Sequence, residues 1–163
     1  MLSIVTRGFV IGAVVLGGLL AGMAADKAVV QLPAWRQLEP ATWRRFTLEA
    51  DLGRGLVLYP AQGIAALLCS VVAAITFRFD RGAPGGAALP IYLAAALAIA
   101  GLLVTVRAVA PELLTLRQTG QDPTAVRTAL DGVTGWWSIK AALHVATFGA
   151  NVWSLVALSG AAK

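Results

Sequence analysis

Four apolar stretches dominate this chain, and each contains at most one Asp, Glu, Lys or Arg residue over a length that can cross a membrane. They lie at about residues 8–25, 55–77, 87–106 and 139–159. A helix rises about 1.5 Å per residue, so about 20 residues cross a hydrocarbon core of about 30 Å. The sequence therefore predicts an all-α integral membrane protein. We expect residues 1–163 to form one transmembrane domain, a four-helix bundle of up-down-up-down topology.

The composition excludes several other classes of protein. With 58% hydrophobic and 13% charged residues among 163, the chain is too apolar for an ordinary soluble domain. The net charge of +5 comes from basic residues that are dispersed and mixed with acids. This pattern favours lipid headgroups over nucleic acid as the charged partner. The single cysteine, Cys69, excludes an intramolecular disulfide. We expect the bacterial inner (plasma) membrane as the location.

The first stretch is rich in glycine. Gly8 with Gly12, and Gly18 with Gly22, have the four-residue spacing that lets helix backbones approach closely. This spacing predicts tight helix packing, and it makes the first helix a candidate surface for a homo-oligomer. Arg7 before the apolar run also resembles the start of a signal peptide. We expect the segment to be retained as a membrane anchor.

The connections before the second and fourth stretches carry helix-start signals. Pro40 and Pro123 are typical of a first helical turn, and they predict short interfacial helices in connections 1 and 3. Trp35, Trp43 and the pair Trp136-Trp137 fit an aromatic belt at the level of the lipid headgroups. Four spans place both termini on one side of the membrane. The Lys and Arg counts of the loops conflict on which side this is, and we expect the cytoplasmic side.

The last stretch carries a line of polar residues. Their spacing of four, three, four and three places them on one narrow face of a helix, which should turn away from lipid. They are Lys140, His144, Thr147, Asn151 and Ser154.

The second stretch has a weaker polar face that can oppose the first. Its members are Asp51, Gly55, Tyr59, Gln62, Ala66 and Ser70. Pro60 follows Tyr59 and predicts a kink in the first turns of this helix. Asp51 has two candidate partners, Arg54 on its own helix and Lys140 across the mouth of the bundle.

His144 is the only histidine of the chain, which excludes multi-histidine metal sites, bis-histidine haem and histidine-rich di-iron sites. We predict no metal site, and the residues leave the cofactor open. A catalytic His144 would then transfer a proton or act as a single axial ligand. Otherwise it makes an interhelical hydrogen bond to Gln62 or Tyr59. Thr147 and Asn151 fit packing donors as well as ligand contacts, and Lys140 can extend its ammonium to the membrane interface.

Several short motifs resemble the anthrone oxygenase-like family of small four-span membrane proteins. They are Leu32-Pro33-Ala34-Trp35, the run from Ala50 to Gly55 with Tyr59-Pro60 behind it, and a histidine in the last span. The resemblance covers the whole four-span plan. It implies oxidation of polycyclic aromatic anthrones to anthraquinones, and it supplies no catalytic residues to transfer.

Two interpretations follow from the sequence. In the first, a cofactor-free oxygenase-like enzyme binds a lipophilic aromatic molecule between the second and fourth helices. His144 and Tyr59 would then be catalytic, and the candidate substrate-binding residues are Gln62, Asn151, Thr147, Lys140 and Asp51. In the second, the polar faces only join helices, and the protein is a non-catalytic binding or transport module or an accessory subunit.

Overall fold

The structure, a computed structural model, describes residues 2–120 and 122–160, and these residues form an all-helical bundle. The described residues make four helical rods, which we number in chain order. Rod 1 contains α1 (Leu2–Asp26), the π-helical turn η1 (Lys27–Gln31) and α2 (Leu32–Trp35). Rod 2 contains α3 (Pro40–Glu49), the π-helical turn η2 (Ala50–Arg54) and α4 (Gly55–Phe79). Rod 3 contains the short 3₁₀ turn η3 (Gly85–Ala87), α5 (Ala88–Val104), the π-helical turn η4 (Thr105–Val109) and α6 (Ala110–Gln118). Rod 4 is the single helix α7 (Pro123–Gly160).

Each rod of the described chain is long and apolar enough to cross a membrane, and each contains one of the predicted spans. The predicted fold class is therefore confirmed, and four such helices indicate an integral membrane protein. The rods also exceed the thickness of the hydrocarbon core. At about 1.5 Å per residue, the 38 residues of α7 extend about 57 Å, against about 30 Å for the core. Part of the bundle therefore extends beyond the lipid tails.

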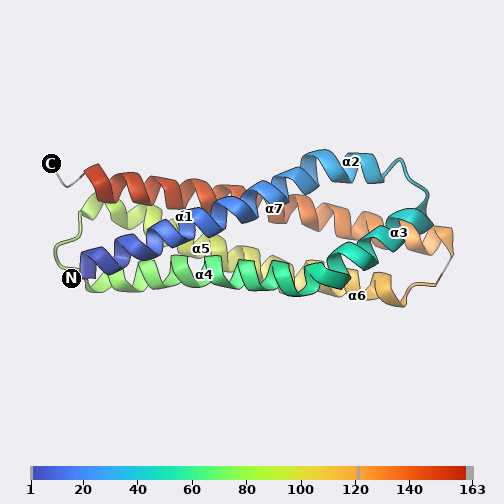
Figure 1. Cartoon of the computed structure of the whole chain (residues 1–163), viewed down its shortest axis with the longest axis horizontal. Helices are drawn as coiled ribbons and strands as arrows, with labels where there is room; N and C mark the ends of the chain where they lie inside the picture. The colour runs from blue at the N-terminus through green and yellow to red at the C-terminus, as the bar shows by residue number, and fades with distance from the viewer. Residues whose placement is uncertain (1, 121, 161–163) are drawn as a thin grey trace.

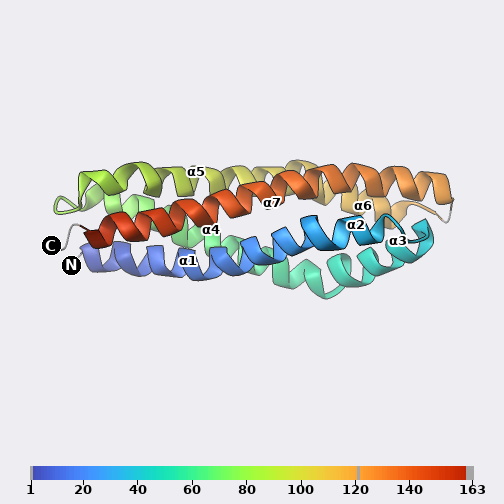
Figure 2. The same ribbon diagram turned by 90° about the horizontal axis from the view of Figure 1, so that it is seen from above.

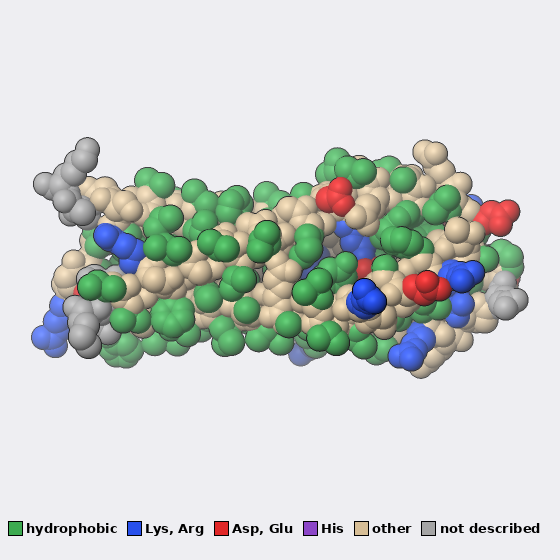
Figure 3. All heavy atoms as spheres, viewed as in Figure 1, with side chains coloured by type: hydrophobic (Ala, Val, Ile, Leu, Met, Phe, Trp, Pro, Cys, Tyr) green, Lys and Arg blue, Asp and Glu red, His purple; other side chains and the backbone are tan. Residues whose placement is uncertain are grey.

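The start of α1 and the end of α7 lie at one end of the bundle, which we call the terminal end (Figure 1; Figure 2). The opposite, connection end holds α2, α3 and α6, the additional helices of connections 1 and 3. They continue the long direction of the bundle, and Pro123 begins the long helix α7 instead of the predicted short helix (Figure 2). Figure 3 shows charged side chains near both ends and a stretch of hydrophobic side chains between them, as expected for a lipid-facing belt.

Two apolar clusters hold the rods together, one toward each end. The terminal cluster is formed by Val10, Ala73, Ala74, Phe77, Ala87, Ile91, Ala95 and Leu158. The connection cluster is formed by Leu32, Trp35, Trp43, Val109, Leu116, Val126, Leu130, Val133 and Trp137. The small residues of the terminal cluster let helices approach closely, whereas the tryptophans fill the wider connection end.

The connection cluster corrects the predicted aromatic belt. Trp43 is only 1% exposed, and Trp35 and Trp137 are also buried, so these rings face the core rather than lipid headgroups. Their rings pack together, with centroids 6.3 Å apart for Trp35 and Trp43 and 6.0 Å apart for Trp35 and Trp137. Trp136 remains exposed, and among these four tryptophans it alone keeps the surface position. A tryptophan near a membrane edge packs inward when neighbouring helices cover it, which the sequence does not reveal.

Three π-helical turns interrupt the described rods, and all three adjoin the middle of the bundle. A π turn is a wider turn that shifts the faces on which the following side chains lie, and such turns often occur at functional sites. In η2 the backbone leaves helical geometry at Gly53, with φ −91° and ψ −112°. Pro60, where the sequence predicted a kink, lies inside helix α4, and the departure from helical geometry in η2 is at Gly53.

Gly55 is a close-approach position just after this break. A β-carbon at Gly55 would lie 2.5 Å from the carbonyl oxygen of Ala50 and 2.6 Å from the Tyr59 ring. Real β-carbons do not come so close to other atoms, so a larger residue must move the π turn or the ring. Gly55 therefore positions Tyr59 as well as the turn that carries Asp51.

The glycines of α1 pack mainly inside this chain. Gly12 contacts the Cys69 side chain, and Gly18 contacts the Phe148 ring, with β-carbon positions 3.2 Å and 3.0 Å from the nearest atoms. Helix α1 lies against α4 and α7. The predicted close packing of this helix is thus internal at these positions, and the homo-oligomer stays a prediction.

Replacing Gly55 by alanine should destabilise the protein by about 1–3 kcal/mol, because the added methyl group overpacks the turn. The measurement is the thermal midpoint of the purified protein in detergent. Gly63→Ala is the matched control on the same helix, since nothing lies within 4 Å of its β-carbon position. Equal midpoints for the two variants would contradict the close-approach argument.

Candidate functional site

A cavity of about 680 Å³ lies between the two apolar clusters and is lined by residues of all four rods. Most of its lining is apolar, with polar side chains gathered toward the connection end. The volume is in the range typical of small-molecule sites, about 300–1,000 Å³. The predicted site between helices 2 and 4 is thus bounded by rods 1 and 3 as well.

The polar face of α7 lines this cavity over most of its predicted length. Trp137, Lys140, His144, Thr147 and Asn151 all contribute to the wall. Ser154, the last member of the predicted face, is fully buried and donates to the carbonyl oxygen of Ala150. The polar face therefore lines the cavity from Lys140 to Asn151 and packs against neighbouring helices at Ser154.

The predicted face of rod 2 is only partly correct. Asp51, Gly55, Tyr59 and Ser70 line the cavity, but Gln62 does not. Helical geometry explains the difference. Pro60 and Gly63 lie on the face of α4 that lines the cavity, and Gln62 lies beside this face. No hydrogen bond joins His144 to Gln62 or Tyr59 in the described part of the chain, so the predicted interhelical bond is not formed.

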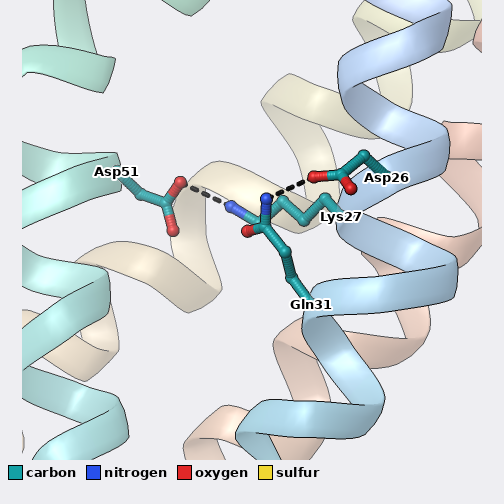
Figure 4. A network of polar contacts seen from close by, with 4 residues as sticks. All are labelled: Asp26, Lys27, Gln31 and Asp51. Carbon is teal, nitrogen blue, oxygen red and sulfur yellow. Dashed lines mark hydrogen bonds and ion pairs between the residues drawn. The ribbon is translucent and has the colours of Figure 1, made fainter.

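Asp51 pairs with neither of its predicted partners. The Lys27 ammonium contacts Oδ1 of Asp51 at 2.5 Å and joins rod 1 to rod 2 (Figure 4). The side chains are 17% and 5% exposed, so this ion pair is buried, while Arg54 is exposed. Beside it, Gln31 donates to Asp26 at 2.6 Å (Figure 4).

Aromatic rings complete the surroundings of the Lys27 ammonium. Its Nζ atom lies 3.8 Å from the ring centroid of Trp137, 5.3 Å from that of Trp35 and 6.0 Å from that of Tyr59. A cation over an aromatic face is stabilised by about 0.5–2 kcal/mol, more when it is desolvated. Lys27 is a residue of the site that the sequence pattern did not indicate. Its signal was a lysine directly after an apolar run, and that signal equally fits a membrane-edge position.

The inner end of the polar face is held by internal hydrogen bonds. Asn151 donates to the Ser70 hydroxyl at 3.3 Å and joins α7 to α4, while Thr147 donates to the carbonyl oxygen of Leu143 at 2.7 Å. Both side chains are buried. These bonds are of the packing kind, so Asn151 and Thr147 shape the wall of the cavity.

At the end of the cavity near Asp51, Lys140 and His144, several polar side-chain atoms lack a hydrogen-bond partner among the described residues. Oδ2 of Asp51 and Nε2 of His144 are buried and have no hydrogen-bond partner among the described residues. Lys140 is half-buried and makes no hydrogen bond or ion pair within residues 2–120 and 122–160, whereas the sequence predicted that it extends to the interface. Unpaired buried polar groups are costly, and here they belong to residues that line one cavity.

The described residues contain no group of three or more His, Cys, Asp and Glu placed to hold a metal ion. The polar groups of the cavity include an imidazole, a phenol, a paired carboxylate and two ammonium groups. This set suits hydrogen bonding and proton transfer to an organic molecule.

Comparison of the chain with protein-family models, with curated proteins and with solved structures finds no match in any of the three. The fold and the site define the class: a four-helix integral membrane protein with a mostly apolar cavity between its helices. Its family is not shown, and the resemblance to anthrone oxygenase-like proteins stays a prediction.

Asp51→Asn should lower the free energy of unfolding by about 3–5 kcal/mol, because it leaves the buried Lys27 ammonium without its counter-charge. The double variant Lys27→Met with Asp51→Leu should be more stable than Asp51→Asn, since no unpaired charge remains. The measurement is unfolding by denaturing detergent, followed by tryptophan fluorescence.

Arg45→Ala is the control for this series. It breaks the Arg45–Glu49 pair, whose side chains are 83% and 70% exposed, and should cost less than about 1 kcal/mol. A loss at Asp51→Asn as small as that at Arg45→Ala would show that the buried pair does not join the rods.

Proposed function

We propose that the cavity binds a lipophilic aromatic small molecule taken from the membrane, and that the protein oxidises this molecule as an oxygenase-like enzyme. The cavity itself carries the proposal, because it combines an apolar wall with one polar end that contains His144. Its location would be the bacterial inner membrane, since proteins that span the outer membrane are typically β-barrels.

The walls of the cavity also support entry from lipid. Leu56 and Ile64 of rod 2 and Leu102 and Val106 of rod 3 line the cavity and have exposed side chains. A molecule dissolved in the lipid tails can therefore reach the cavity between these rods without crossing water. The polar end then orients it, as in other apolar sites with a few polar groups.

His144 is the proposed general base. Its imidazole lines the cavity, and Nε2 is free of hydrogen bonds to the described residues. The proposed substrate carries a CH₂ group between aromatic rings and opposite a ketone. His144 takes one proton from this carbon, and Tyr59 donates a hydrogen bond to the ketone oxygen on which the charge develops.

Dissolved oxygen is the oxidant in this scheme. The carbanion transfers electrons to O₂ and forms a C–O bond, and the proton held by His144 gives a hydroperoxide. Loss of the second C–H proton with cleavage of the O–O bond leaves a new ketone and releases water. In sum, CH₂ and O₂ become C=O and H₂O. The reaction class comes from the sequence resemblance, and the site comes from the cavity.

A second candidate function is a non-catalytic binding or transport module or an accessory subunit. The Asn151–Ser70 hydrogen bond and the internal bond of Thr147 favour it, because they show that part of the polar face serves packing. In this case His144 contributes to stability or ligand affinity and not to turnover.

His144→Gln should reduce conversion of anthrone to anthraquinone by about 10²–10⁴-fold, the usual contribution of a general base. The measurement is anthraquinone absorbance in aerated detergent solution, corrected for uncatalysed oxidation. Thr147→Val is the matched control, since its hydroxyl lines the cavity but is bonded to its own helix. It should keep most of the wild-type rate.

A His144→Gln variant that converts anthrone at the wild-type rate would exclude His144 as the base. Wild-type protein that binds anthrone, seen as a raised thermal midpoint, but does not convert it would favour the non-catalytic function.

A further inference from the structure

We infer that the cavity binds its ligand as an anion, and that the Lys140 ammonium is the counter-ion. The ligand is then the conjugate base of an acidic lipophile, such as an aromatic carboxylate or phenolate. This inference rests on the proposed function for the existence of a ligand and adds the charge that the ligand carries.

The charges that line the cavity lead to this conclusion. Lys27 is neutralised by Asp51 at 2.5 Å, and Asp26 is exposed and accepts a hydrogen bond from Gln31. Lys140 is the remaining charged residue of the wall, and it has no hydrogen-bond or ion-pair partner among the described residues. One positive charge therefore faces an apolar cavity without a partner.

An unpaired ammonium in apolar surroundings is unfavourable, since it loses hydration and gains no counter-charge. An ammonium offers three hydrogen-bond donors and no acceptor, so an anionic oxygen satisfies it best. A ligand with an apolar body and one anionic group fills both parts of the cavity.

Lys27 cannot supply this contact as easily. Its ammonium is held at Asp51 and lies 3.8 Å from the Trp137 ring centroid, and moving it would break both contacts. Asp51 and Lys27 are nevertheless close enough for their charges to act on Lys140. The Lys27–Asp51 pair is thus held in place, and Lys140 is the charged group available to contact the ligand.

The position of Lys140 also connects anion binding with the proposed proton transfer. Lys140 precedes His144 by four residues, so the two side chains lie one turn apart on the same face of α7. A substrate whose CH₂ proton passes to His144 gains negative charge next to this ammonium. The same contact then stabilises the bound anion and the anion formed in the reaction.

The test measures dissociation constants by quenching of tryptophan fluorescence, with the full chain in an uncharged detergent. The probes share a naphthalene body and differ in charge: 2-naphthoate, its methyl ester and 2-naphthylmethylamine. Wild-type protein should bind 2-naphthoate at least about tenfold more tightly than the neutral ester, a difference of about 1.4 kcal/mol.

Lys140→Gln should weaken 2-naphthoate to the level of the ester and leave the affinity for the ester unchanged. Lys140→Arg keeps the charge and should keep the preference for the acid, which also protects the test against a glutamine variant that folds poorly. Arg107→Gln is the matched control, because Arg107 is exposed, lies on rod 3 and does not line the cavity. It should bind all probes as the wild type does.

The ester or the amine binding as tightly as the acid would overturn the anion site while leaving the proposed lipophile site intact. A Lys140→Gln variant that folds and still prefers the acid would overturn the role of Lys140. If no probe binds the wild-type protein, the proposed function fails together with this inference. Laurate that binds as tightly as 2-naphthoate would support the anion site and assign its ligand to fatty acids of the membrane.

Discussion

The buried ion pair between Lys27 and Asp51 is the contact on which the middle of the bundle depends. Taking two charges out of water costs several kcal/mol per ion, and the pair is tolerable only because each partner is closely held. Asp51 receives the ammonium at 2.5 Å, and Trp137 offers its ring face at 3.8 Å. The ion pair joins rods 1 and 2, and Trp137 of rod 4 packs on the ammonium, so the pair lies where the connection cluster meets the cavity.

Two apolar clusters, one on each side of the cavity, explain how the bundle can contain a cavity. The terminal cluster closes one end with small residues, and the connection cluster closes the other with tryptophans. Between them the π turns η1, η2 and η4 interrupt rods 1, 2 and 3, and residues of each turn line the cavity. A wider turn redirects the side chains that follow it, and in η2 the backbone also leaves helical geometry at Gly53. The cavity thus results from backbone irregularities as much as from small side chains.

The site illustrates how far periodic patterns predict a membrane protein. The face of α7 was predicted correctly down to His144 and Asn151, because α7 is one regular helix and its period of 3.6 residues continues without interruption. In rod 2 the same method placed Gln62 in the site, where the structure does not, and it chose wrong partners for Asp51. The π turn η2 carries Asp51 itself, so a constant period does not relate this residue to those on α4. Lys27 begins the π turn η1 directly after an apolar run, and a lysine in that position equally fits the membrane edge, so its role was missed.

The sequence alone determined the membrane class and the four-span plan. The length of an apolar segment and its lack of charge are local properties, and they decide whether a helix can cross the hydrocarbon core. It also determined that polar groups of the last helix turn inward. Tertiary structure decided which groups meet: Lys27 with Asp51, Asn151 with Ser70, and Trp43 with the core instead of the lipid headgroups. These pairings join residues distant in sequence, and they depend on how rods of different lengths, broken by π turns, pack against each other. No local pattern encodes that packing, so the cavity and its charge balance appear only in three dimensions.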